Sequence, residues 1–181
     1  MKETNGFIDL KARRDDIKSH ALRCFDRITG LPKEIMPDVK YRTGVQVTVK
    51  QWGTARNQIF FSVYKPSEDA QFFSAEKLVR SHAHGDFASQ NSQNPEEGEY
   101  AGSITVFING VYTQVSVSGL IGEEDVAMAV LIMAYIFNLS PAEVCRHAVS
   151  HDAELPTEFG DKNHYLHHFV SWELVNQEEL L

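Results

Sequence analysis

The stretch SITVFINGVYTQVSVS, residues 103–118, carries the strongest structural signal in the sequence. Ile104, Val106 and Ile108 share one face of a first strand, and alternate residues from 111 to 117 share one face of a second. Between them, Asn109-Gly110 readily takes the two positive-φ positions of a type I′ turn. The stretch therefore predicts an antiparallel β-hairpin with one buried face on each strand.

The rest of the chain predicts a second hairpin and several helices. Residues 44–50 alternate valine with polar residues, which indicates a half-buried strand, and residues 58–64 are expected to pair with it. Helices are expected over residues 9–28, 68–90, 123–138 and 140–151, and from about 161 to the C-terminus. Phe72 and Val79 are among the residues of the second helix expected to face a core. This order predicts one α+β domain, in which helices cover an antiparallel sheet of four to five strands.

Composition excludes several classes of function. The chain has 181 residues and a net charge of −8, from 25 acidic and 17 basic residues, so it would repel a nucleic acid. The basic clusters are short, and one of them is Lys11, Arg13 and Arg14. The longest apolar run, Val126–Phe137, is too short to span a membrane, and the N-terminus has no apolar run of signal-peptide length. Two cysteines make no disulfide framework, so we expect a cytoplasmic protein.

Residues 102–129, GSITVFINGVYTQVSVSGLIGEEDVAMA, resemble the signature of the GlcG/HbpS-like group, also called the haem-degrading domain family. The shared features are a hairpin with a glycine turn, the sequence Val117-Ser118-Gly119, and an acidic turn followed by D-x-x-x-A, here Asp125 to Ala129. Phe73 and Lys77 match the aromatic residue and lysine that relatives carry on the preceding helix. The Ser-Gly-Leu form of the turn is closest to an uncharacterised branch of the family.

The resemblance implies a profilin-like fold that assembles into homo-oligomers. Some relatives bind haem or corrinoid-type ligands, and others have no settled activity. The resemblance ends near Asn138. We therefore expect a GlcG/HbpS-like domain over residues 1–138 and a helical extension, residues 139–181, packed on the same domain.

The turn after the hairpin has two interpretations. Ser118 and Gly119 precede a helix start, where free N–H groups favour anions, so they could line a ligand site. However, Glu123, Glu124 and Asp125 already occupy the first turn of that helix and would repel a phosphate. A fold-capping role is the alternative.

A small basic patch is predicted on the second helix, from Lys77, Arg80 and His84. Such a patch would suit a carboxylate-bearing ligand, for example a haem propionate or a peptide C-terminus. The alternative is a solvated helix face. Ser81, His82 and Asp86 lie close in sequence, but sequence adjacency does not make a catalytic triad.

Five other histidines are candidate ligands. His20 shares a helix face with Cys24 and could bind haem axially, or it could be a packing residue. The pairs His147/His151 and His164/His168 each have i,i+4 spacing and could together bind zinc or another divalent metal. A polar surface or an oligomer contact is the alternative for these pairs.

Three functions remain open from the sequence. The first is a cytoplasmic, oligomeric binding protein for a carboxylate-bearing or tetrapyrrole ligand. The second is a metal-dependent enzyme that uses the C-terminal histidines. The third is a structural or adaptor protein, with the Val126–Phe137 helix or the C-terminal extension at an interface.

Overall fold

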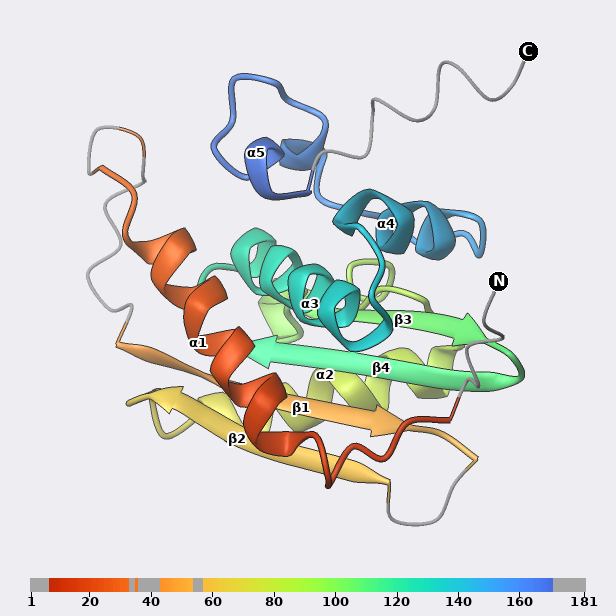
Figure 1. Cartoon of the computed structure of the whole chain (residues 1–181). Coiled ribbons are helices and arrows are strands. Elements are labelled where there is room, and N and C mark those ends of the chain that lie inside the picture. The colour runs from red at the N-terminus through yellow and green to blue at the C-terminus, as the bar shows by residue number, and fades with distance from the viewer. Residues whose placement is uncertain (1–6, 33–34, 36–42, 54–56, 171–181) are drawn as a thin grey trace.

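The computed structural model of the protein describes residues 7–32, 35, 43–53 and 57–170. Five α-helices, four strands and two short 3₁₀ turns are present in this part of the chain (Figure 1). In chain order they are α1 (Arg14–Thr29), β1 (Gly44–Gln51), β2 (Gln58–Tyr64), α2 (Ala70–His84), η1 (Pro95–Glu97), β3 (Ser103–Ile108), β4 (Val111–Ser118), α3 (Gly122–Phe137), α4 (Pro141–Val149), η2 (Thr157–Phe159) and α5 (His167–Val170).

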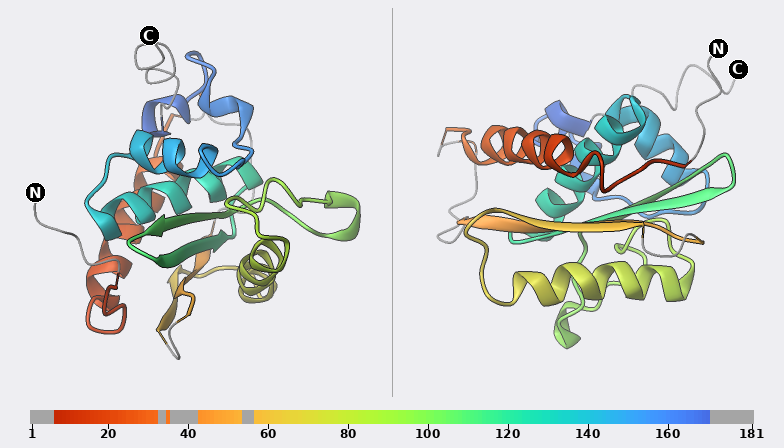
Figure 2. Two further views of the ribbon diagram at one scale, coloured as in Figure 1. Left: turned by 90° about the vertical axis from the view of Figure 1, so that its right-hand side faces the viewer. Right: turned by 60° about the horizontal axis from the view of Figure 1, so that its bottom comes forward.

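The four strands form one antiparallel sheet in the order β2-β1-β4-β3. Both predicted hairpins are confirmed, and Asn109 and Gly110 have φ values of 48° and 82°, as a type I′ turn requires. Helices α1, α3 and α4 lie on one side of the sheet and α2 lies on the other (Figure 2). This is the predicted profilin-like α+β fold, with four strands.

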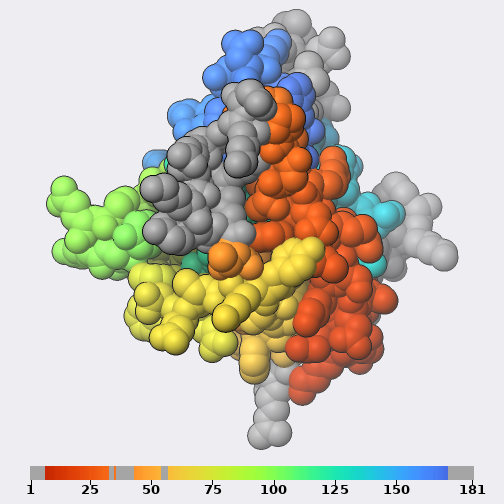
Figure 3. All heavy atoms as spheres, turned by 90° about the vertical axis from the view of Figure 1, so that its left-hand side faces the viewer, coloured from red at the N-terminus to blue at the C-terminus, as the bar shows by residue number. Residues whose placement is uncertain are grey.

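The apolar core lies between the sheet and the layer of α1 and α3. Val47 pairs with Phe61 and Val117 across the three neighbouring strands, and all three side chains are buried. Helix α3 is buried along nearly its whole length, which explains its almost uniformly apolar sequence. Helix α1 covers strand β2 at the sheet edge, and Figure 3 shows the two side by side (α1 red to orange, β2 yellow).

The opposite face of the sheet is polar and is also buried, which corrects the expectation of a half-buried β1. Gln46 and Thr48 of β1 lie beneath α2, and the Thr48 and Ser74 hydroxyls are 2.9 Å apart. Ser74 also donates to the Ser116 carbonyl oxygen of β4. Helix α2 therefore packs on the sheet through paired hydroxyl groups. Because these groups satisfy one another, the strands can be buried on both faces with apolar residues on only one.

Helix α2 is shorter than predicted, and its exposed face is more apolar. It ends at His84, because Gly85 takes a left-handed conformation with φ 75°. Phe72 and Val79, expected in the core, are 67% and 59% exposed. The prediction was wrong because the side of α2 that faces the sheet is its polar side.

A buried ion pair connects the layers on either side of the sheet. Lys77 of α2 is 1% exposed, and its Nζ donates to Asp125 Oδ2 of α3 and to the Val117 carbonyl oxygen, at 2.9 Å each. The side chain passes Gly102, where a Cβ atom would lie 2.6 Å from Nζ. Burial raises the pKa of Asp125 to about 6, although Lys77 and a hydrogen bond from the Leu120 N–H oppose this shift.

Residues 139–170 pack on α3 and β3 and extend the same layer. The predicted capping box is confirmed, since Ser140 and Glu143 exchange hydrogen bonds at the start of α4. The Tyr165 hydroxyl donates to the buried Glu124 carboxylate of α3. In place of a helix from about residue 161, the chain has turns and then the short α5, and η2 lies in the loop before them. The remainder of the predicted segment, residues 171–181, lies outside the described residues.

None of the helices in the described segments is long and apolar enough to cross a membrane by itself. Helices α3 and α4 reach the required length and composition only as a pair, and that pair is bent by 105°.

The ion pair predicts a non-additive response to mutation. In Lys77→Met the Asp125 carboxylate stays buried without its cation, so the unfolding free energy should fall by about 3–5 kcal/mol. In the double variant Lys77→Met/Asp125→Asn both charges are absent, while the Asn oxygen still accepts from Leu120. It should therefore lose less stability than Lys77→Met alone, as urea unfolding would measure.

Lys65→Met is the matched control, because Lys65 is exposed and should change stability little. A double variant that loses the sum of the two single losses would show that the two charges do not act as a pair.

Candidate functional site

The predicted basic patch on α2 does not form, because two of its three members are buried in internal bonds. Lys77 is held by Asp125, as described above. Arg80 is 7% exposed, binds Glu76, and donates to the carbonyl oxygens of Ser89, Ser92 and Tyr100. Arg80 therefore fixes the loop of residues 85–102 against α2. His84, the third member, is exposed.

Ser118 and Gly119 lie where the end of β4 meets the start of β1, and position 119 has no room for a side chain. Ser118 is buried and pairs with Gln46 in the sheet register. A Cβ atom at Gly119 would lie 2.4 Å from the Gly44 carbonyl oxygen. Of the two interpretations of this turn, the packing supports fold capping.

The candidate metal ligands have other partners. His147 Nε2 accepts a hydrogen bond from the Phe107 N–H at 2.8 Å, and His151 stacks on Phe87 with 4.2 Å between ring centroids. His164 Nδ1 accepts from the Leu166 N–H, and His168 is exposed. In the described part of the chain no three His, Cys, Asp or Glu side chains are placed to hold a metal ion. Three of the four histidines therefore take part in contacts within the chain.

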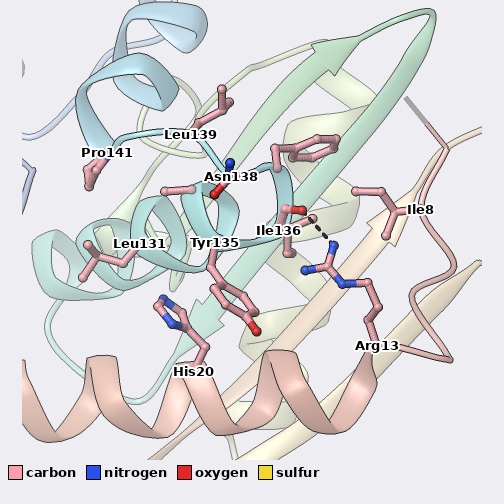
Figure 4. A pocket seen from close by; sticks show the side chains of 11 residues that line it. Ile8, Arg13, His20, Leu131, Tyr135, Ile136, Asn138, Leu139 and Pro141 are labelled. Carbon is pink, nitrogen blue, oxygen red and sulfur yellow. Dashed lines mark hydrogen bonds between the residues drawn. The ribbon is translucent and has the colours of Figure 1, made fainter. Parts of the chain in front are cut away.

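His20 is a predicted ligand residue that lines a cavity. The cavity is a groove of about 630 Å³ between α1 and the C-terminal end of α3 (Figure 4). Its walls are mainly apolar, and its polar groups are few. The lining residues are Ile8, Arg13, His20, Leu131, Ala134, Tyr135, Ile136, Phe137, Asn138, Leu139 and Pro141.

The His20 and Tyr135 rings form one wall of the groove. They are stacked with 4.2 Å between centroids and 6° between planes. Burial, then the nearby Arg23, lowers the pKa of His20, while a hydrogen bond with the Leu131 backbone opposes the shift. The imidazole is therefore neutral at neutral pH and adds aromatic surface to the site.

Arg13 is the charged group of the groove. It lies at the start of α1, and its Nη1 donates to the Ile136 carbonyl oxygen at the end of α3, at 2.9 Å. The guanidinium carbon is 5.7 Å from the centre of the Tyr135 ring. Within the described residues Arg13 makes no ion pair. A guanidinium has five N–H donors, so most of them remain available to a ligand.

Haem ligation by His20 would disturb an existing contact. The imidazole lies flat against Tyr135, and Arg23 Nη2 lies 3.5 Å from His20 Nδ1, so an iron ion at Nδ1 would displace Arg23. The groove can instead hold a flat apolar group against the rings and place a carboxylate at Arg13.

Two residues of this site were missed from the sequence, although one had a signal. The signal was the hydroxyl of Tyr135, which is the single polar side-chain group in the run Val126–Phe137. In the structure Tyr135 is half-buried, and the other residues of this run are buried. Arg13 had no signal, because it looked like one of several surface cations near Lys11 and Arg14. What distinguishes Arg13 from these cations is a tertiary contact, its hydrogen bond to Ile136, which lies 123 positions away in the chain.

The bond between His147 and Phe107 predicts acid sensitivity. Burial, then His151, lowers the pKa of His147 below its usual 6.5. Since the unfolded state binds the proton more readily, the unfolding free energy should fall as the pH drops below about 6.5. His20 and His82, whose pKa values are also lowered, should add to the slope.

Replacement by a neutral residue isolates the share of His147. In His147→Gln the decline in stability between about pH 7 and about pH 5 should be shallower than in the wild type, as urea unfolding at a series of pH values would measure. His168→Gln, a change at an exposed histidine, is the control. Equal slopes in the wild type and His147→Gln would contradict the assignment.

Comparisons of the chain with protein families, with curated proteins and with solved structures found no match, so membership of the GlcG/HbpS-like family stays a prediction.

Proposed function

We propose that the protein binds a small organic acid, with a planar apolar body and one carboxylate, in the groove between α1 and α3. The observation that carries the proposal is Arg13, a cation without an acidic partner among the described residues, at the edge of an apolar groove. The groove volume of about 630 Å³ lies within the range of small-molecule sites.

The charge around Arg13 supports an acid as the ligand. The carbonyl groups at the end of α3 carry partial negative charge, and Arg13 offsets it through the bond to Ile136. A ligand carboxylate would bind the outer N–H groups of the guanidinium, away from the helix end. Because the whole chain has a net charge of −8, such a local cation matters for attracting an anion.

The lining favours binding over catalysis. No Ser, Cys, Asp or Glu is among the described residues that line the groove. Among these lining residues, His20 therefore has no nucleophile or carboxylate with which to form a catalytic pair. Its parallel stacking on Tyr135 suits a role in holding an aromatic or other flat group.

A pair of matched aromatic probes tests the proposal. By calorimetry, 2-naphthoate should bind the wild-type protein more tightly than the uncharged 2-naphthol. Arg13→Gln should weaken 2-naphthoate binding roughly tenfold to a hundredfold, because a hydrogen bond to a charged group contributes about 1.5–3 kcal/mol. Binding of 2-naphthol should change little in the same variant.

Arg14→Gln is the control, since Arg14 carries the same charge on the exposed side of α1. Equal affinities of the wild type for the two probes would overturn the proposal, as would unchanged 2-naphthoate binding by a folded Arg13→Gln variant.

Self-association stays a prediction from the family resemblance. Of the two surfaces named for an interface, the Val126–Phe137 helix is covered within the chain, because all of its residues except Tyr135 are buried. The C-terminal extension stays the other candidate. Light scattering at micromolar concentration would decide whether the protein is an oligomer.

A further inference from the structure

A second cavity lies on the other side of the sheet, at the C-terminal end of α2. Its volume is about 150 Å³. Helix α2 ends at His84, so the last turn of the polar interface between helix and sheet is left uncovered there. The cavity opens beside the exposed His82 and Gly85. Its walls combine aromatic rings from three segments, Trp52, Phe87 and Tyr112, with polar side chains of α2 and β4.

One polar group of this cavity is unsatisfied. Asp86 lines it, and the Asp86 Oδ2 atom is buried without a hydrogen-bond partner. Within the described residues, the Asp86 side chain makes no ion pair either. A buried carboxylate oxygen without a partner is costly, so its retention points to a partner supplied from outside the chain.

The neighbouring polar groups differ from Asp86, because they satisfy one another. Ser81 Oγ donates to the Lys77 carbonyl oxygen and accepts from Gln114 Nε2. Gln114 Oε1 in turn accepts from Trp52 Nε1 at 3.0 Å. These bonds also rule out a Ser81–His82–Asp86 triad, since His82 stacks on Trp52 with 3.4 Å between centroids.

We propose that this cavity binds a small alkylammonium ion, with its charged nitrogen at Asp86 and its carbon chain against the rings of Phe87 and Tyr112. A cavity of about 150 Å³ accommodates a ligand of about six heavy atoms. The Phe87 and Tyr112 rings meet edge to face at 5.9 Å, and Tyr112 is 43% exposed, so it forms the outer lip.

The alternatives to an organic cation fit the lining less well. A divalent metal ion prefers several oxygen ligands, and Asp86 is the single carboxylate among the described lining residues. An anion would be repelled by Asp86. The pKa of His82 is lowered by burial and then by Lys50, so its imidazole is uncharged at neutral pH and does not repel an ammonium group.

Nuclear magnetic resonance with butylammonium as the probe tests this site. The indole N–H signal of Trp52 should shift on titration, because that group is bonded to Gln114 in the cavity wall. A Trp172→Phe variant assigns the signal, since Trp172 is the other tryptophan of the chain. Uncharged 1-butanol, of nearly the same size, should bind at least tenfold more weakly.

Asp86→Asn should bind butylammonium at least tenfold more weakly than the wild type. The variant should remain folded, because the substituted carboxylate has no internal partner. Asp69→Asn is the matched control, since it removes the same charge from the exposed start of α2. If Asp86→Asn does not fold, Tyr112→Ala and the comparison of butylammonium with 1-butanol decide the question.

The source of the amine is a separate arm of the experiment. Tighter binding of Nα-acetyl-lysine methylamide than of butylammonium would identify a lysine side chain of a polypeptide as the ligand. The reverse order would identify a free small amine. The proposal is overturned if the Trp52 signal does not move at millimolar butylammonium, if 1-butanol binds equally well, or if folded Asp86→Asn binds as the wild type does.

Discussion

The position of α2 relative to the other helices is set by the buried ion pair between Lys77 and Asp125. It joins α2, on one side of the sheet, to α3 on the other, and it does so past the start of β3. Gly102 has φ 143° and no room for a side chain, so the path of the lysine and the entry of the chain into β3 are fixed together. The cost of burying two charges offsets much of their attraction, so the pair adds little net stability. Its main effect is on the placement of the two helices.

The two faces of the sheet are buried by different kinds of side chain. Valine, isoleucine and phenylalanine cover the face toward α1 and α3, where contact area provides the stabilisation. Hydroxyl and amide groups cover the face toward α2, where each polar atom needs a defined partner. A polar interface of this kind fixes one register of helix on sheet. Two buried oxygen atoms on this side of the sheet, Ser116 Oγ beneath α2 and Asp86 Oδ2 two residues beyond its end, have no hydrogen-bond partner within the described residues.

The sequence was sufficient for the strands and insufficient for the packing of α2. Alternation and the Asn109-Gly110 turn located β3 and β4 to the residue, because a hairpin is a local structure. Phe72 and Val79 were misplaced, since periodicity reports which helix face is apolar and not which face meets the sheet. Arg13 reaches a backbone oxygen on α3, and no local pattern encodes such a contact. The histidine pairs led to the opposite error, because a pattern in the sequence predicted a metal site that the structure does not form. An i,i+4 spacing is equally suited to a metal site and to ring packing.

Both cavities occur where a helix ends, and this shared origin explains their opposite preferences for charge. At the end of α3 the Ile136 carbonyl oxygen accepts from Arg13, which has donors left over. At the end of α2 the helix terminates on Gly85, and the chain turns back to place a carboxylate against the polar face of the sheet. The two proposals therefore assign an acid to one site and an amine to the other, and the sheet separates the sites. A ligand for one site would be rejected by the charge of the other, so the two can be tested independently in the same molecule.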